Sequence, residues 1–152
     1  MQVLAAFALL FLLIPGARAD PTIAAGETIY RQGILPDGKL LRGMRQADVN
    51  VEGADAACIV CHRRSGLGTQ EGRYLIPPII GKYLFRPGLK AVQDMSLPHV
   101  EGYLPSRTAY TDATLARVIR EGIDPDGHEL NYLMPRFRLD DADMASLIAY
   151  LR

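Results

Sequence analysis

The chain has 152 residues, and its 17 Lys and Arg balance its 17 Asp and Glu. A chain of this length suits one domain of ordinary size. The balanced charge argues against nucleic acid as a partner, because binding to phosphates requires a concentrated basic surface.

The N-terminal segment has the pattern of a secretory signal peptide. An uninterrupted apolar run extends from Val3 to Ile14, and an A-x-A site ending at Ala19 follows it. This pattern predicts export and cleavage after Ala19. Because no Lys or Arg precedes the run, an uncleaved membrane anchor and a buried helix stay open as alternatives. We therefore expect residues 1–19 to be a signal peptide and residues 20–152 to form one periplasmic domain without a transmembrane helix.

The first part of this domain is predicted to contain a helix, a loop and a second, shorter helix. Thr22 can cap a helix that runs to about Gln32, and Gly33 can end it. Residues 34–53 are rich in turn formers and are interpreted as loop. Residues 54–64 are expected to form the short second helix.

The middle of the chain is predicted to contain a long insertion. Residues 82–110 include three prolines and show no sustained hydrophobic period. A loop this long in a compact domain is usually functional or poorly ordered. We expect it to cover an edge of the functional site or to form a docking surface, and an insertion without function is the alternative.

Two further helices are predicted towards the C-terminus. Thr111 begins the first, whose apolar residues share one face, and Gly122 ends it. Asp140 can cap the last helix, in which Met144 falls among the core positions. The chain has no β-alternation of note, so the prediction is an all-α fold.

A five-residue motif indicates the chemistry. Residues 58–62 read Cys-Ile-Val-Cys-His, the C-x-x-C-H pattern that attaches c-type haem. One turn of helix places Cys58 and Cys61 on the same side, so both thiols can reach the two vinyl groups of one porphyrin. His62 can then direct its imidazole at the iron. The rival interpretations are a redox dithiol, expected near a βαβ pattern that is not found here, and a zinc site, which needs four ligands.

The iron needs a second axial ligand or an open distal face. The side chains that could serve are methionines and histidines, namely Met44, Met95, Met134, Met144, His99 and His128. Met134 precedes Pro135, and a residue before proline is biased away from helical geometry. Met134 can therefore project from an extended strap, and we expect it to be the distal ligand, with His99 or His128 as alternatives.

With these features the chain resembles the class I c-type cytochromes, small all-α domains with one haem between a C-x-x-C-H segment and a C-terminal Met loop. In that family a Gly and an aromatic residue four apart in the first helix pack against an aromatic residue of the last helix. Gly26, Tyr30 and Tyr150 match this pattern. Residues 77–81 resemble the family's P-x-L-x-G loop, which implies that the Pro77 carbonyl accepts the N–H of His62 and orients the ring.

The resemblance implies a mono-haem electron carrier and not an enzyme. It would cycle between Fe(II) and Fe(III), exchange electrons with a protein donor and a protein acceptor, and work as a monomer or as a subunit of a larger redox complex. Residues 82–110 would mark a specialised branch of the family. Arg63 or Arg73 could neutralise a haem propionate, with a solvated surface role as the other reading. The alternative function is a haem-based sensor, or a haem subunit of an oxidoreductase, with an open distal site.

Overall fold

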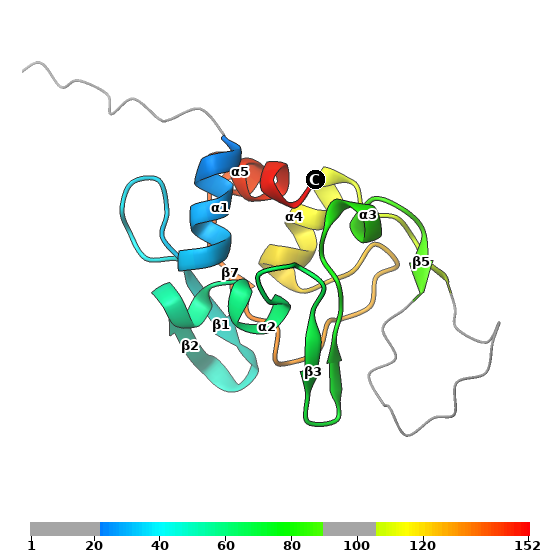
Figure 1. Ribbon diagram of the computed structural model, residues 1–152. Helices are drawn as coiled ribbons and strands as arrows, with labels where there is room; N and C mark the ends of the chain where they lie inside the picture. The colour runs from blue at the N-terminus through cyan, green and yellow to red at the C-terminus, as the bar shows by residue number, and fades with distance from the viewer. Residues whose placement is uncertain (1–21, 90–105) are drawn as a thin grey trace, which may run out of the picture.

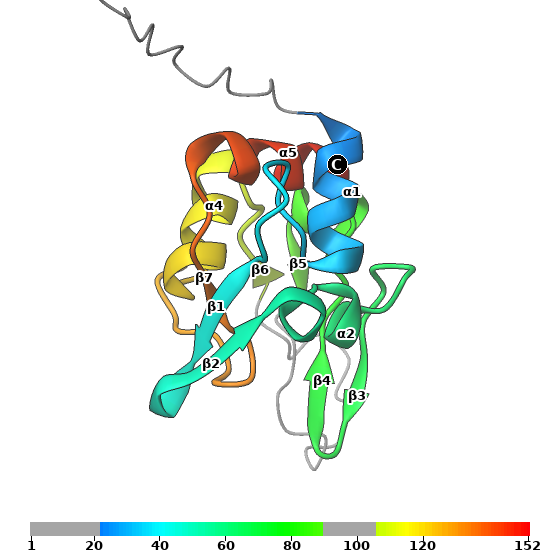
Figure 2. The same cartoon turned by 90° about the vertical axis from the view of Figure 1, so that its left-hand side faces the viewer.

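The computed structural model describes residues 22–89 and 106–152, and the predicted signal peptide lies outside the described residues. Three helices form one layer: α1 (Ile23–Gln32), α4 (Asp112–Glu121) and α5 (Asp141–Leu151). Two hairpins extend from the same side of this layer, as Figures 1 and 2 show from two directions. The short helix α2 (Ile59–His62) lies in the chain between them.

The predicted ends of the three long helices are confirmed. The side chain of Thr22 accepts a hydrogen bond from the Ala25 amide at the start of α1, and Gly33 ends that helix in the left-handed conformation. Thr111 caps α4 and Gly122 ends it in the same way. Asp140 caps α5. These ends follow from local chemistry, because a capping side chain satisfies amides that have no partner within the helix.

Helices α1 and α5 cross at very short range. A Cβ atom at Gly26 would lie 2.0 Å from the carbonyl oxygen of Ser146, so no larger residue fits this position without a shift of the backbone. One turn later the rings of Tyr30 and Tyr150 pack with their centroids 5.3 Å apart. The packing predicted for Gly26, Tyr30 and Tyr150 is therefore confirmed.

The prediction of an all-α fold is wrong, because the chain also forms three small antiparallel sheets. Strands β1 (Arg42–Arg45), β2 (Val49–Glu52) and β7 (Arg136–Phe137) form one sheet in the order β2-β1-β7. Strands β3 (Thr69–Glu71) and β4 (Tyr74–Ile76) form the second, and β5 (Gly88–Leu89) pairs with β6 (Ser106–Arg107) in the third. The described chain is thus a mixed helix and strand fold.

The sequence did not predict these strands, and the reason is physical. Each has only two to four residues, which is too short for a period of two to emerge from the sequence. Their pairing also joins segments far apart in the chain, since Gly43 of β1 lies opposite Phe137 of β7. Residues 34–53 are consequently only partly loop.

Two other expectations need correction. Residues 54–64 do not form one helix: the 3-10 turns η1 (Gln46–Asp48) and η2 (Gly53–Ala56) precede α2, and an extended Ala57 separates η2 from it. Residues 82–110 are not entirely irregular, because α3 (Gly81–Leu84), β5 and β6 lie within or at the edge of that stretch. The β5–β6 pair places residues 88–89 of this stretch side by side with residues 106–107.

The core is formed mainly by side chains of α1, α4 and α5, with Phe137 as the contribution of the sheet of β1, β2 and β7. Its largest fully buried side chains are Ile29, Tyr30, Leu41 and Leu147, and the predicted core residue Met144 is also buried. Within residues 22–89 and 106–152, none of the helices combines the length and the apolar character needed to span a bilayer.

Candidate functional site

The motif at residues 58–62 folds as a single helical turn. The His62 amide donates to the Cys58 carbonyl over 2.9 Å, and the Arg63 amide donates to the Ile59 carbonyl over 3.0 Å. Cys58 and Cys61 therefore lie on the same side of one turn, and both are free thiols. Cys58 packs against the core that includes Tyr30 and Ile29.

The side chain of His62 is buried, with 6% of the residue exposed. Its Nδ1 lies 3.0 Å from the carbonyl oxygen of Pro77. A carbonyl oxygen can only accept, so Nδ1 carries the proton and the lone pair of Nε2 is available to a metal. Burial lowers the pKa of His62, while the hydrogen bond to Pro77 acts in the opposite sense. The neutral imidazole is the form that ligates iron.

The hairpin of β3 and β4 brings Pro77 back to His62. The Gly68 amide donates to the His62 carbonyl over 3.1 Å, and the Ile79 amide donates to the Gly66 carbonyl over 2.7 Å. Gly68 has φ +78°, and a Cβ atom there would lie 1.9 Å from the Ile76 oxygen. Glycine at this position therefore lets the chain after β4 return close enough for its carbonyl to reach the imidazole.

Met134 lies in a turn just before β7 and packs, half-buried, against the core. Its amide donates to the Asn131 carbonyl over 3.1 Å. The guanidinium of Arg136 donates to the carbonyl of Met134 over 2.5 Å and to that of Leu130 over 3.3 Å. Arg136 therefore holds the turn at two points.

The turn that contains Met134 contacts the hairpin that supports His62. The rings of Tyr132 and Tyr74 meet edge to face, with their centroids 5.8 Å apart. Through this contact, the segment that contains Met134 lies against the hairpin that leads to Pro77, the partner of His62.

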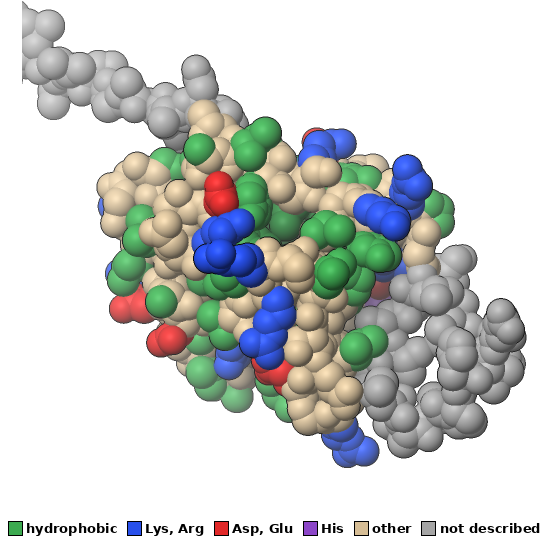
Figure 3. Space-filling view, viewed as in Figure 1, with side chains coloured by type: hydrophobic (Ala, Val, Ile, Leu, Met, Phe, Trp, Pro, Cys, Tyr) green, Lys and Arg blue, Asp and Glu red, His purple; other side chains and the backbone are tan. Residues whose placement is uncertain are grey.

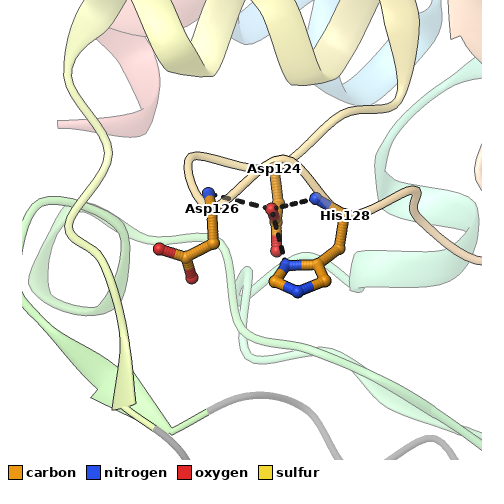
Figure 4. Close-up of side chains that lie close together, drawn as sticks. All are labelled: Asp124, Asp126 and His128. Atoms are coloured by element: carbon orange, nitrogen blue, oxygen red, sulfur yellow. Dashed lines mark hydrogen bonds and ion pairs between the residues drawn. The ribbon is translucent and has the colours of Figure 1, made fainter.

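The other predicted distal ligands are placed differently. Met144 is buried in α5, and Met44 lies on β1 with 37% of its surface exposed. His128 belongs to a turn in which the carboxylate of Asp124 accepts hydrogen bonds from the amides of Asp126 and His128 over 3.0 and 2.8 Å, and its ring also lies near that carboxylate (Figure 4). Met95 and His99 lie outside the described residues.

The protonation of the two cysteines argues against a redox dithiol. Burial raises the pKa of Cys58 to about 12 and also raises the pKa of Cys61. A reactive dithiol would have at least one thiol with a lowered pKa. Among the described residues, the side chains that could share a metal ion are Asp124, Asp126 and His128, and neither cysteine is among them.

A model of the family "Cytochrome c" matches residues 52–152, which is well over half of the chain and includes the whole motif. The chain belongs to the cytochrome c family. It is therefore a haem c electron-transfer protein. No curated protein and no solved structure matches the chain.

The residues of this cytochrome fit a covalently attached haem. Two free thiols lie on one turn, the buried imidazole presents Nε2, and a half-buried thioether belongs to a segment in contact with the supporting hairpin. Several large apolar side chains that follow the motif or precede Met134 in the chain are more than one-third exposed, namely Val60, Leu67, Leu75, Tyr83 and Tyr132. Exposed apolar side chains of this kind would gain from burial against a porphyrin.

Sequence reasoning missed one residue of this region, Arg45 at the end of β1. Its charge lowers the pKa of Cys61, as does that of Arg63, whereas burial and Glu71 raise it. The Nε atom of Arg45 is buried and has no hydrogen-bond partner among the described residues. Because the sequence predicts a loop for residues 34–53, it gives no sign that the charge of Arg45 acts on the motif.

Proposed function

We propose that this cytochrome is an exported one-electron carrier with one haem attached to Cys58 and Cys61 and with His62 and Met134 as axial ligands. The observation that supports this most directly is the hydrogen bond between His62 Nδ1 and the Pro77 carbonyl. It leaves Nε2 unprotonated on the same helical turn as two free thiols. A haem bound there supplies an iron that takes up and releases one electron.

The residues around the motif would tune that exchange. The hydrogen bond from His62 to Pro77 fixes the tautomer and the orientation of the ring and makes the imidazole a stronger donor. The thioether of Met134 is a soft ligand, and pairing Met with His raises the reduction potential. With both axial positions taken by the protein, external ligands would be excluded from the iron.

The partners would be a protein donor and a protein acceptor that bind briefly. Exposed basic residues follow the motif, namely Arg63, Arg64, Arg73, Lys82 and Arg86, and Figure 3 shows several basic side chains on the face that it presents. Weak electron-transfer interfaces are small, and charge on such a face increases the rate of encounter. The protein would act as a monomer or as a subunit of a larger redox complex.

N-terminal sequencing of the purified protein tests the proposed export. The protein is produced with its full N-terminus in a host that exports proteins and attaches haem c. We expect the mature chain to begin at Asp20 and to carry one haem. A mature haem protein that still begins at Met1 would instead support an uncleaved anchor.

The ligands are tested with optical spectra of the matured protein, oxidised and reduced, with and without carbon monoxide. We expect the oxidised form to show the weak far-red band of sulfur-to-iron charge transfer and the reduced form to exclude carbon monoxide. Met134→Ala should abolish the band and admit carbon monoxide. Met44→Ala, at an exposed methionine of β1, is the matched control and should change neither property.

Other outcomes distinguish the alternatives. Rapid binding of carbon monoxide by the unmodified protein, without the sulfur band, would disprove Met134 ligation and favour a sensor or a haem enzyme with an open distal site. A matured chain without covalent haem would disprove the attachment itself.

A further inference from the structure

Arg45 is a half-buried cation, and the hydrogen bonding of its guanidinium is incomplete. It is the last residue of β1, and its Nε atom is buried without an acceptor in residues 22–89 and 106–152. A guanidinium is always charged, and its donors normally find acceptors when they are removed from water. The structure therefore indicates that an acceptor from outside the described chain completes this group.

The position of Arg45 indicates where that acceptor belongs. Its charge acts on Cys61, the second cysteine of the motif, so the guanidinium lies within electrostatic reach of that thiol. Strand β1 also pairs with β7 in the register Met44 opposite Arg136, two residues after Met134. Arg45 thus acts on the motif through its charge and ends a strand that pairs with the segment directly after Met134.

The neighbouring arginines are already engaged or lie in solvent. Arg42, on the same strand, pairs with Glu52 over 3.5 Å and is exposed. Arg63 donates to the hydroxyl of Thr69 over 3.3 Å and is also exposed. Arg117 has a buried Nε without a partner as well, but its Nη2 donates to the Asp124 carbonyl over 2.5 Å. Arg45 therefore combines a buried Nε that has no partner in the described residues with a charge that acts on the motif.

We propose that Arg45 binds a carboxylate of the cofactor, namely one of the two propionates of the haem. This inference rests on the function proposed above. Carboxylate is the acceptor that the planar fork of a guanidinium matches best, and such charge-assisted hydrogen bonds are stronger than neutral ones. Arg45 lies in the β1–β2 hairpin, before the motif in the chain. It replaces Arg63 and Arg73 as the candidate for binding a propionate.

Two measurements on the matured haem protein test the assignment without relying on activity. The propionate-bending band in the resonance Raman spectrum reports hydrogen bonding to the propionates, and potentiometry reports the reduction potential. We expect Arg45→Gln to shift the band and to lower the potential, because an uncompensated propionate favours the more positive ferric iron. Arg42→Gln removes the same charge from the same strand and should leave the band unchanged, with a smaller change in potential.

Arg45→Lys keeps the proposal testable if the Gln variant does not mature. Lysine retains the charge but not the guanidinium fork, so the Raman band should still shift while the potential changes less than in Arg45→Gln. An unchanged band in Arg45→Lys or Arg45→Gln would overturn the inference, since it would mean that Arg45 pairs with a carboxylate of the protein. Failure of the unmodified chain to bind haem covalently would overturn the proposed function and this inference together.

Discussion

The hydroxyl of Tyr30 in α1 donates a 2.7 Å hydrogen bond to the carbonyl oxygen of Arg63, the residue directly after the haem-binding motif. Arg63 has φ +64°, in a region that residues other than glycine seldom adopt. The unusual conformation turns the chain away from α2 towards the hairpin that supports His62. The first helix thus stabilises the end of the motif directly, through one side chain.

Tyr30→Phe should lower the free energy of unfolding by about 1–2 kcal/mol, because it leaves the Arg63 carbonyl without its partner. Chemical denaturation of the matured protein measures this change. Tyr83→Phe is the control, since Tyr83 is 40% exposed, and it should cost less than about 0.5 kcal/mol. Equal losses in the two variants would contradict the role assigned to the Tyr30 hydrogen bond.

Stability should also decrease at alkaline pH, and Tyr30 should contribute to that decrease. Burial raises the pKa of Tyr30 above the ordinary tyrosine value of about 10. Above that pH the unfolded chain loses the proton while the folded chain retains it, so stability falls as pH rises. In denaturation series from roughly pH 9 to 11, the decline should be less steep for Tyr30→Phe than for the unmodified protein. Tyr83→Phe should follow the unmodified protein, and parallel curves for all three would contradict the prediction.

Gly68→Ala should disturb the contact between His62 and Pro77. The added Cβ would lie 1.9 Å from the Ile76 oxygen and 2.9 Å from the Pro77 oxygen. Because a displaced Pro77 carbonyl would leave His62 a weaker donor, we expect a higher reduction potential and a smaller yield of haem protein. Potentiometry and the haem content of purified protein measure the two effects.

Gly72→Ala is the matched control for this experiment. Gly72 lies in the same hairpin with φ +58°, yet its added Cβ would meet nothing within 4 Å. Gly72→Ala should therefore cost about 1–2 kcal/mol of stability from backbone strain but leave the potential unchanged. Equal shifts in potential would show that general loosening of the hairpin, and not the position of Pro77, is responsible.

Arg136→Gln should loosen the turn that contains Met134. The variant loses charge-assisted hydrogen bonds to the carbonyls of Met134 and Leu130, which we expect to cost about 1.5–3 kcal/mol. Each 1.4 kcal/mol corresponds to a factor of ten, so the fraction of molecules with Met134 detached should rise at least about tenfold. The rate at which carbon monoxide binds the reduced protein measures that fraction. Arg138→Gln, at an exposed arginine two residues later, should bind carbon monoxide at the unmodified rate.

Much of the helical framework was predictable from the sequence because its signals are local. Thr22, Thr111 and Asp140 cap their helices as expected, and Gly33 and Gly122 end theirs. A cap depends on a side chain and the amides within one turn of it, so neighbouring residues suffice to identify it. The resemblance to cytochromes c also located the contact between Tyr30 and Tyr150 and the one between His62 and Pro77.

The strands could not be predicted from the sequence, and neither could the role of Arg45 near the motif. Sheets of two to four residues contain too little pattern, and their stability comes from partners such as Phe137, far along the chain from Gly43.

The sequence by itself determined the capped helices, the C-x-x-C-H motif and, through that motif, the family to which the chain belongs. Tertiary structure alone decided that much of residues 34–53 forms a hairpin and that Tyr30 binds the carbonyl of Arg63. The difference is physical: a helix cap or a haem motif is complete within a few neighbouring residues. A hydrogen bond from Tyr30 to a carbonyl far along the chain, or the effect of the Arg45 charge on Cys61, exists only after the whole chain has packed.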